Sequence, residues 1–299
     1  MKTAFLGPRG TFSEEAALAR GGDGTGAEAD LVAFDSFPAL TSAVETGLAE
    51  EAVLPIENSI EGAVGTTLDL LIHETPLRIR GELVLPVRQF LITAPGAGLD
   101  DIKVVVSHPQ GLAQCRRFLE RCLPRVEQVA ALSTAGAVKE TVEAGARDRA
   151  AISTLRAAHL YGGSVLAHDI QDARTNVTRF VVLGRDDAPP TGDDKTSIGF
   201  TVKQNVPRAL HAILTEIADE GLQMTKIESR PTKGWLGDYV FLVDFEGHRL
   251  DPAVAALLER IRVKTGTLSV FGSYPRFPLD SLRDAIGAPP ASWGDGVVG

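Results

Sequence analysis

The chain has 299 residues and a net charge of −9 at neutral pH, with 39 acidic against 30 basic side chains. This length allows two domains and a sizeable core, and the acidic balance argues against nucleic acid as a partner. No apolar run approaches a membrane span, and the N-terminus lacks a basic region followed by an apolar one. We therefore expect a cytoplasmic protein with no membrane partner.

Cysteine and histidine usage indicates neither a disulfide nor a metal site. Cys115 and Cys122 lie seven residues apart on an expected helix, which separates them by about 10 Å along its axis, too far for a disulfide. We interpret both as core thiols in a reducing compartment. The six histidines show no metal-ligand spacing. The glycine-rich segment at 21–26 follows a helix rather than a strand, so it predicts a flexible turn.

Short apolar runs alternate with helical patterns through residue 183. This alternation predicts an α/β region with a largely parallel sheet covered by helices. The strands are expected at residues 3–6, 52–55, 104–106, 129–132, 150–152 and 180–183.

A different pattern follows the segment 184–195, which is rich in Asp, Gly and Pro and is expected to be a linker. Between residues 196 and 275 the order strand, helix, strand, strand, helix, strand predicts an α+β ferredoxin-like domain. Its strands are expected at 196–202, 225–227, 239–245 and 267–271, and its helices at 208–219 and 251–263. Residues 276–299 form an expected tail, disordered from 288 onward.

Several strand-to-helix junctions in the first region carry helix-capping residues. Thr11, Asn58 and Ser107 are each followed three residues later by Glu or Gln, the spacing of a capping box. Helix N-termini hold carboxylates well, and in α/β sheets such junctions gather beyond the carboxyl ends of the strands. A single box is usually only a cap. The set predicts a site for a small dianion, completed by one or two arginines.

Five short motifs in a fixed order carry a family resemblance. They are Gly-Pro-Arg-Gly-Thr-Phe-Ser at 7–13, Pro-Ile-Glu-Asn-Ser at 55–59, Ser-His-Pro-Gln at 107–110 with Gln114-Cys115, Asn-Val-Thr-Arg-Phe at 176–180, and Lys-Ile-Glu-Ser-Arg-Pro at 226–231. The chain resembles the monofunctional prephenate dehydratases with a C-terminal ACT regulatory domain, over residues 2 to about 283.

The resemblance implies a two-lobed, periplasmic-binding-protein-like catalytic region over residues 1–183. One lobe would take roughly 1–80 with 170–183 and the other 81–169, joined by crossings at 80–85 and 169–178. The ACT domain would span 196–275. Closure of the lobes would exclude water from the site.

The resemblance also implies the reaction: prephenate loses carbon dioxide and water to give phenylpyruvate, with no cofactor or metal. Thr178 would supply the essential hydroxyl, although by itself it would be interpreted as a strand threonine bonded to backbone. Arg179 would sharpen this donor or clamp a carboxylate, and Phe180 would form a dry wall that favours decarboxylation. Glu57 is the second candidate acid, if burial raises its pKa. Substrate binding would fall to Thr11, Asn58, Ser59, Ser107 and Gln114.

In the ACT domain the resemblance implies that L-phenylalanine binds as allosteric effector between paired domains, in a homodimer or homotetramer. The corresponding residues are Ala209, Leu210, Glu228, Ser229, Arg230 and Pro231. Arg208 stands where the family usually has glycine, which leaves open whether phenylalanine inhibits.

Three alternatives stay open from the sequence. The substrate could be arogenate, which carries an amino group in place of the ketone. The chain could be a non-catalytic amino-acid sensor or solute-binding protein on the same fold. The ACT domain could serve dimerisation alone.

Overall fold

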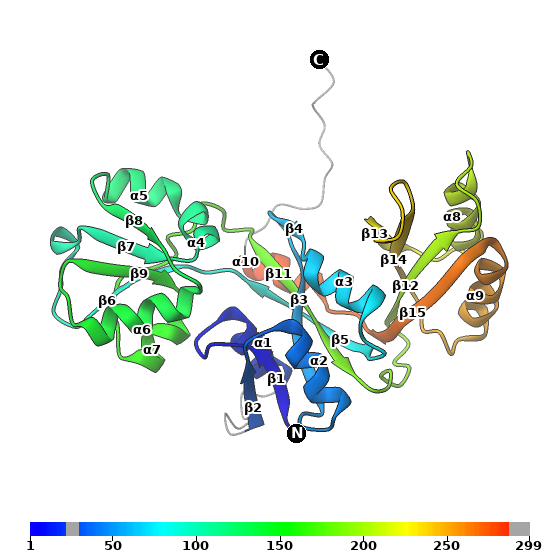
Figure 1. Ribbon diagram of the computed structural model, residues 1–299, viewed down its shortest axis with the longest axis horizontal. Coiled ribbons are helices and arrows are strands. Elements are labelled where there is room, and N and C mark those ends of the chain that lie inside the picture. The colour runs from blue at the N-terminus through cyan, green and yellow to red at the C-terminus, as the bar shows by residue number, and fades with distance from the viewer. Residues whose placement is uncertain (22–29, 287–299) are drawn as a thin grey trace, which may run out of the picture.

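The computed structural model describes residues 1–21 and 30–286, so the expected disordered end and most of the glycine-rich turn lie outside the described residues. Three α/β units lie side by side along the long axis of the molecule (Figure 1). The first lobe occupies the centre, the second lobe one end, and the C-terminal domain the other. This arrangement agrees with the two-lobed region and the third, ferredoxin-like unit expected from the sequence.

The first lobe is a mixed sheet of order β2-β1-β3-β11-β5, with the short β4 paired to β3. Strands β1, β2 and β3 are parallel, whereas β11 runs antiparallel to both β3 and β5 because the chain returns from the second lobe through it. The strands are β1 (Thr3–Leu6), β2 (Leu31–Phe34), β3 (Glu51–Asn58), β4 (Gly62–Ala63), β5 (Arg78–Pro86) and β11 (Val177–Gly184). The helices are α1 (Phe12–Arg20), α2 (Phe37–Glu45) and α3 (Gly65–His73).

The second lobe holds a five-stranded mixed sheet of order β10-β6-β9-β7-β8, with only β7, β8 and β9 parallel. Its strands are β6 (Phe90–Thr93), β7 (Val104–Ser107), β8 (Glu127–Ala130), β9 (Arg149–Ser153) and β10 (Ser164–Ala167). Its helices are α4 (Pro109–Gln114), α5 (Arg116–Cys122), α6 (Thr134–Ala144) and α7 (Leu155–Tyr161). The largely parallel sheet expected from the sequence is therefore two mixed sheets.

Three local expectations need correction. The first crossing, expected at 80–85, belongs to β5 and pairs with β11, so the chain passes between lobes after Pro86. The strand expected at 129–132 ends at Ala130, and Leu132 is fully exposed. Cys115 is buried as expected, but Cys122 is an exposed thiol.

The C-terminal domain is a βαββαβ unit with the antiparallel sheet order β13-β14-β12-β15. Its elements are β12 (Asp194–Val202), α8 (Ala209–Asp219), β13 (Met224–Pro231), β14 (Tyr239–Glu246), α9 (Pro252–Lys264) and β15 (Thr265–Pro275). The strands extend beyond the expected ranges, and β12 takes in the last two residues of the expected linker. A further helix, α10 (Leu279–Ile286), begins in the segment expected to be a tail.

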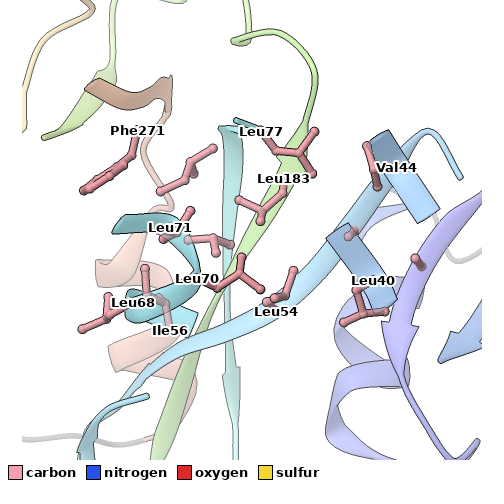
Figure 2. Close-up of a cluster of buried hydrophobic side chains, with 14 of the residues drawn as sticks. Leu40, Val44, Leu54, Ile56, Leu68, Leu70, Leu71, Leu77, Leu183 and Phe271 are labelled. Atoms are coloured by element: carbon pink, nitrogen blue, oxygen red, sulfur yellow. The ribbon is translucent and has the colours of Figure 1, made fainter. Parts of the chain in front are cut away.

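The C-terminal domain shares a core with the first lobe. Phe271 belongs to the same buried cluster as Leu71, Leu77 and Leu183 (Figure 2). Strand β15 lies so close to β5 that a Cβ on Gly272 would come within 2.1 Å of the Ile79 carbonyl oxygen, a contact that only glycine permits. The segment before β12 therefore joins two domains that pack directly, rather than tethering a mobile one.

The described part of the chain has no helix long and apolar enough to cross a membrane. Among the same residues, no cluster of His, Cys, Asp or Glu could hold a metal ion.

Candidate active site

A cavity of about 270 Å³ lies between the two lobes, near the lower end of the usual size range for ligand pockets. The first lobe lines it through Phe12, Ser13, Pro55, Asn58, Thr178 and Phe180. The chain between the lobes contributes Val87 and Gln89, and the second lobe contributes His108, Gln110, Gln114 and Thr134. Side chains from both lobes therefore meet in one site.

The alternation of strand β11 decides which part of the Thr-Arg-Phe motif reaches the cavity. Thr178 and Phe180 lie two residues apart and line it, as successive same-face positions of a strand do. Arg179 lies between them and faces the other side of the sheet. A bulge in the β11–β3 pairing sets Thr178 opposite Asn58 and Phe180 opposite Pro55, so both members of each pair line the cavity.

The Thr178 hydroxyl is held by one side chain. Asn58 Nδ2 donates to Thr178 Oγ1 at 2.9 Å and to Asn176 Oδ1 at 2.8 Å. Asn58 Oδ1 accepts from the backbone N–H groups of Ile60 and Glu61, which fixes the orientation of the amide. Because Thr178 accepts from Asn58 and has no acceptor of its own among the described residues, its hydrogen is free to be donated into the cavity.

Phe180 closes the first-lobe side of the cavity with an apolar surface. Its side chain is 1% exposed and packs with Phe5, Val53 and Val182 in a buried cluster. A ring fixed on one side by this cluster gives a rigid and dry wall to the cavity on the other.

The rest of the cavity lining offers uncharged groups and helix N-termini. Gln89 Nε2 donates to Gln114 Oε1 at 3.2 Å, while the buried Gln89 Oε1 has no partner among the described residues. Thr134 begins α6, and Phe12 begins α1, so the N-terminal turns of two helices from opposite lobes reach the cavity. Helix N-termini favour negative charge, and none of the described residues lining the cavity is Lys or Arg.

The structure corrects the expected roles of Arg179 and Glu57. Arg179 contacts Glu57 Oε2 at 3.0 Å, Glu82 Oε2 at 3.2 Å and Asp244 Oδ2 at 2.9 Å. Glu57 also pairs with Lys226 at 3.2 Å. Both side chains lie behind β11 rather than in the cavity, so neither can clamp a substrate carboxylate there, and Glu57 is not the second acid.

Three of the expected substrate-binding hydroxyls are used by the backbone. Thr11 caps α1 and donates to the Leu6 carbonyl oxygen. Ser59 donates to the Thr175 carbonyl oxygen, and Ser107 donates to that of Ile152 at 2.7 Å. None of the three lines the cavity, whereas Asn58 and Gln114 do.

In addition to the chain crossings, polar contacts between α1 and α7 and their preceding loops join the two lobes. Arg156 of α7 donates to Glu14 Oε2 at 2.7 Å and to Glu14 Oε1 at 2.9 Å, and Thr154 donates to the Gly10 carbonyl oxygen at 2.7 Å. Burial alone would raise the pKa of Glu14, but hydrogen bonds from Arg156, Gly10 and Arg9 lower the pKa to about 2. We call Glu14, Arg156, Thr154 and Gly10 the interlobe latch.

Glu15 beside the latch behaves in the opposite way. Burial raises the pKa of Glu15 to about 7, and the nearby Arg156 and Thr154 offset this only in part. The two neighbouring carboxyl groups of α1 therefore differ: the surroundings of Glu14 favour its ionised form, and those of Glu15 favour its protonated form.

Several cavity residues were not expected from the sequence. Ser13, His108 and Gln110 lie inside motifs that were singled out, but their roles were not separated from those of their neighbours. For Gln110 the available signal was its position one helical turn before Gln114, because residues at this spacing can face the same side of a helix and hence the same cavity. Gln89 and Thr134 come from segments without a motif, and only the fold brings them to the cavity.

Comparison with known proteins fits this geometry. The family model described as prephenate dehydratase matches residues 3–188. The chain belongs to the prephenate dehydratase family. The prephenate dehydratase of Mycolicibacterium vanbaalenii is 41% identical over 312 aligned residues, which cover 98% of this chain and 97% of that one. The bifunctional chorismate mutase/prephenate dehydratase of Aquifex aeolicus is 41% identical over 92% of this chain and 74% of its own.

Solved structures agree with this family assignment. The prephenate dehydratase from Arthrobacter aurescens in complex with L-Phe has a TM-score of 0.84 at 34% identity, covering 96% of this chain and 99% of that one. A protein described as a novel type of quorum-quenching acylase has a TM-score of 0.83 at 32% identity, covering 94% of this chain and 100% of its own. As a prephenate dehydratase the chain is a carbon–oxygen lyase of phenylalanine biosynthesis, and its C-terminal domain has the ACT fold.

The expected effector residues divide between the faces of β13. Lys226, Glu228 and Arg230 face the first lobe, where Arg230 pairs with Asp69 at 2.9 Å and Lys226 with Glu228 at 3.3 Å. Ser229 and Pro231 are exposed on the other face. Because Glu228 and Arg230 already have partners within this chain, their contact with an effector stays a prediction.

The backbone at the start of α8 favours glycine at the position that Arg208 occupies. Arg208 precedes Ala209 and Leu210, and its backbone has φ +72°. Glycine adopts this left-handed conformation without a Cβ penalty, which is a physical reason for glycine at this place, independent of any ligand.

Proposed function

We propose that Thr178 is the hydrogen-bond donor to the hydroxyl group that leaves prephenate. One observation carries this role: Asn58 donates to Thr178 Oγ1 at 2.9 Å, which directs the threonine hydrogen toward the cavity. In the reaction the C–C bond to the carboxylate breaks, carbon dioxide leaves, and the electron pair of that bond enters the ring. The ring C–O bond breaks with its electron pair on oxygen, and the departing hydroxide takes up a proton from the medium to become water. Aromatisation drives both departures, so a neutral donor suffices at the leaving oxygen.

Hydrogen-bond donors and helix N-termini of the cavity lining would bind the two substrate carboxylates. Gln114, Gln110, Ser13 and Thr134 supply donors, and the N-terminal turns of α1 and α6 supply a favourable field. Phe180 keeps the carboxylate that leaves away from water, which favours its conversion to neutral carbon dioxide.

The test is to incubate the protein with prephenate and to follow phenylpyruvate by its absorbance in alkali. We expect turnover far above the acid-catalysed background, and a parallel assay with arogenate measures the preference between the two substrates. A protein that gives no product above the background with either substrate would leave the non-catalytic sensor as the better interpretation.

Acyl-amide hydrolysis is the second candidate, because a solved neighbour carries the acylase description. The cavity speaks against it: among the described residues that line it, no Ser or Thr hydroxyl is hydrogen-bonded to His108, whose Nδ1 instead accepts from the Gln110 N–H. Such a pair is the usual means of activating a hydroxyl nucleophile. An assay with an acyl-homoserine lactone separates the two activities.

L-phenylalanine is the proposed feedback effector, and a homodimer or homotetramer is the proposed assembly. The neighbouring structure from Arthrobacter aurescens holds L-Phe. Here β13 is an edge strand, and the same domain exposes the large side chains of Val206, Ile227, Trp235, Leu236 and Tyr239. An open sheet edge and exposed large side chains both favour association with a second copy of the chain. Calorimetry with L-phenylalanine and light scattering after gel filtration test these proposals: a monomer that binds no phenylalanine would refute them.

The cytoplasm is the proposed location. The support comes from the thiols, because Cys122 is exposed and unpaired, a state that a reducing compartment preserves.

A further inference from the structure

Arg179 is the one residue of the Thr-Arg-Phe motif that the reaction leaves without a task. Its side chain is 13% exposed and meets three carboxylates behind the catalytic strand. Burial by itself would lower the pKa of Arg179, but Asp244, Glu82 and Glu57 raise it well above its ordinary value. Burying a charge of this kind is costly, and this one lies directly beside Thr178. We therefore asked what Arg179 could do for its neighbour.

The charges around Arg179 come from both domains. Glu57, Glu82 and Arg179 belong to three strands of the first lobe, whereas Asp244, Lys195 and Lys226 belong to three strands of the ACT domain. Lys195 Nζ contacts Glu82 Oε1 at 2.9 Å, and Ser197 donates to Asp244 Oδ1 at 2.7 Å. We call Arg179, Glu57, Glu82, Asp244, Lys195 and Lys226 the interdomain cluster.

The cluster lies next to the pair that holds the reacting hydroxyl. Thr178 is the cross-strand partner of Asn58, and Arg179 is the partner of Glu57. The Arg179–Glu57 ion pair therefore braces the pairing of β11 with β3 one residue away from the Asn58–Thr178 hydrogen bond. A small shift in this pairing would misdirect the Thr178 hydrogen, because among the described residues only Asn58 is hydrogen-bonded to Thr178 Oγ1.

We propose that Arg179 is a positioning residue: with Glu57 it holds Asn58 and Thr178 in register, and through Asp244 it ties this register to the ACT domain. The inference rests on the proposed role of Thr178 as donor. It also gives the ACT domain a physical route to the cavity, although no described ACT residue lines the cavity. Lys226 Nζ lies 3.2 Å from Glu57 Oε2 and 3.3 Å from Glu228 Oε2. Because Lys226 belongs to β13, a shift of this strand would displace a direct partner of Glu57.

Steady-state kinetics of the full-length protein test the proposal with Arg179→Gln and Asp244→Asn. We expect kcat to fall about tenfold or more in Arg179→Gln, because small misplacements of catalytic groups cost up to about a hundredfold, with KM nearly unchanged. Asp244→Asn should lower kcat in the same sense by less, although Asp244 lies in the other domain. Lys139→Met is the matched control, since it removes only the exposed Lys139–Glu143 pair, and should leave kcat unchanged.

A double-mutant cycle decides whether Arg179 acts through Asn58. In an Asn58→Ala background the hydrogen bond to Thr178 is already lost, so Arg179→Gln should lower kcat little further. Losses that multiply in the double variant would overturn the proposal, and so would a rise in KM without a fall in kcat, which is the signature of a direct substrate contact. If Arg179→Gln does not fold, the same cycle with Asp244→Asn replaces it.

Thr178→Ala separates this inference from the proposed function. Full turnover by Thr178→Ala would refute the role of Thr178 itself. Impaired turnover by Thr178→Ala, together with multiplying losses for Arg179 and Asn58, would refute only the positioning role.

Discussion

The two faces of the sheet around β11 differ in how they use polarity. The face toward the cavity holds uncharged donors, with Asn58 and Thr178 at its centre. The face toward the ACT domain holds buried charges centred on Arg179. The comparison teaches that ionic groups in this protein hold its parts together, as the interlobe latch also does, while neutral groups and helix ends line the cavity that we propose as the site of the reaction.

The largest expected effect belongs to the cavity face. Thr178→Ala should lower kcat by about a hundredfold or more, the usual cost of removing one preorganised hydrogen-bond donor from the charge that develops in a transition state, with a much smaller change in KM. Thr178→Ser keeps the hydroxyl and should retain part of the activity. Equal losses of kcat in the two variants would show that the hydroxyl takes no part in the reaction and would contradict the proposed role of the cavity face.

The next effect belongs to the charged face. Lys195→Met leaves Glu82, which is 3% exposed, without one of its cations, and breaking a buried pair costs about 3–5 kcal/mol. We expect a clear loss of unfolding free energy in urea with an unchanged KM. The exposed Lys139→Met should cost well under about 1 kcal/mol. A raised KM in Lys195→Met would show that the charged face also serves the substrate.

The latch region predicts opposite pH dependences for two neighbouring carboxyl groups. Glu14, with its pKa lowered to about 2, stabilises the fold above the ordinary carboxyl pKa and loses this effect as the pH falls toward 2. Glu14→Gln should therefore destabilise at pH 7, and less so as the pH falls below about 4.5.

Glu15 has its pKa raised to about 7, so its ionisation opposes folding as the pH rises from about 4.5 through 7. Glu15→Gln should stabilise at pH 8 and have little effect at pH 4. Urea unfolding of both variants across this range measures the difference. The same pH trend in both variants would contradict the two assigned environments.

The smallest effect lies in the ACT domain, away from both faces. Arg208→Gly should stabilise the protein by up to about 1 kcal/mol, because glycine tolerates the φ of +72° at this position. Arg208→Ala removes the same charge but keeps the Cβ, so it should give no such gain. Equal stabilities of the two variants, measured in urea, would show that the backbone conformation carries no cost here.

Local pattern predicted much of the fold. Apolar runs predicted the positions of β1, β7 and β9. After residue 195 the order of elements predicted the ferredoxin-like domain, because strand alternation and helical spacing of apolar residues can be told apart there. Strands β2, β4, β5, β6 and β10 were not expected, although β2 and β6 are short apolar runs. The parallel sheet was expected because sequence order alone does not reveal that the chain returns antiparallel through β11.

For the site, the sequence by itself determined the motifs, and with them the family, the reaction and Thr178 as the candidate donor. The period of two along β11 already separates Arg179 from its neighbours, but only the tertiary structure supplied what lies on each side: a cavity in one direction and Glu57, Glu82 and Asp244 in the other. Hydroxyls such as those of Ser59 and Ser107 have the same chemistry whether they meet a substrate or a backbone carbonyl. Their partners are set by segments distant in the sequence, so the fold alone decided their task.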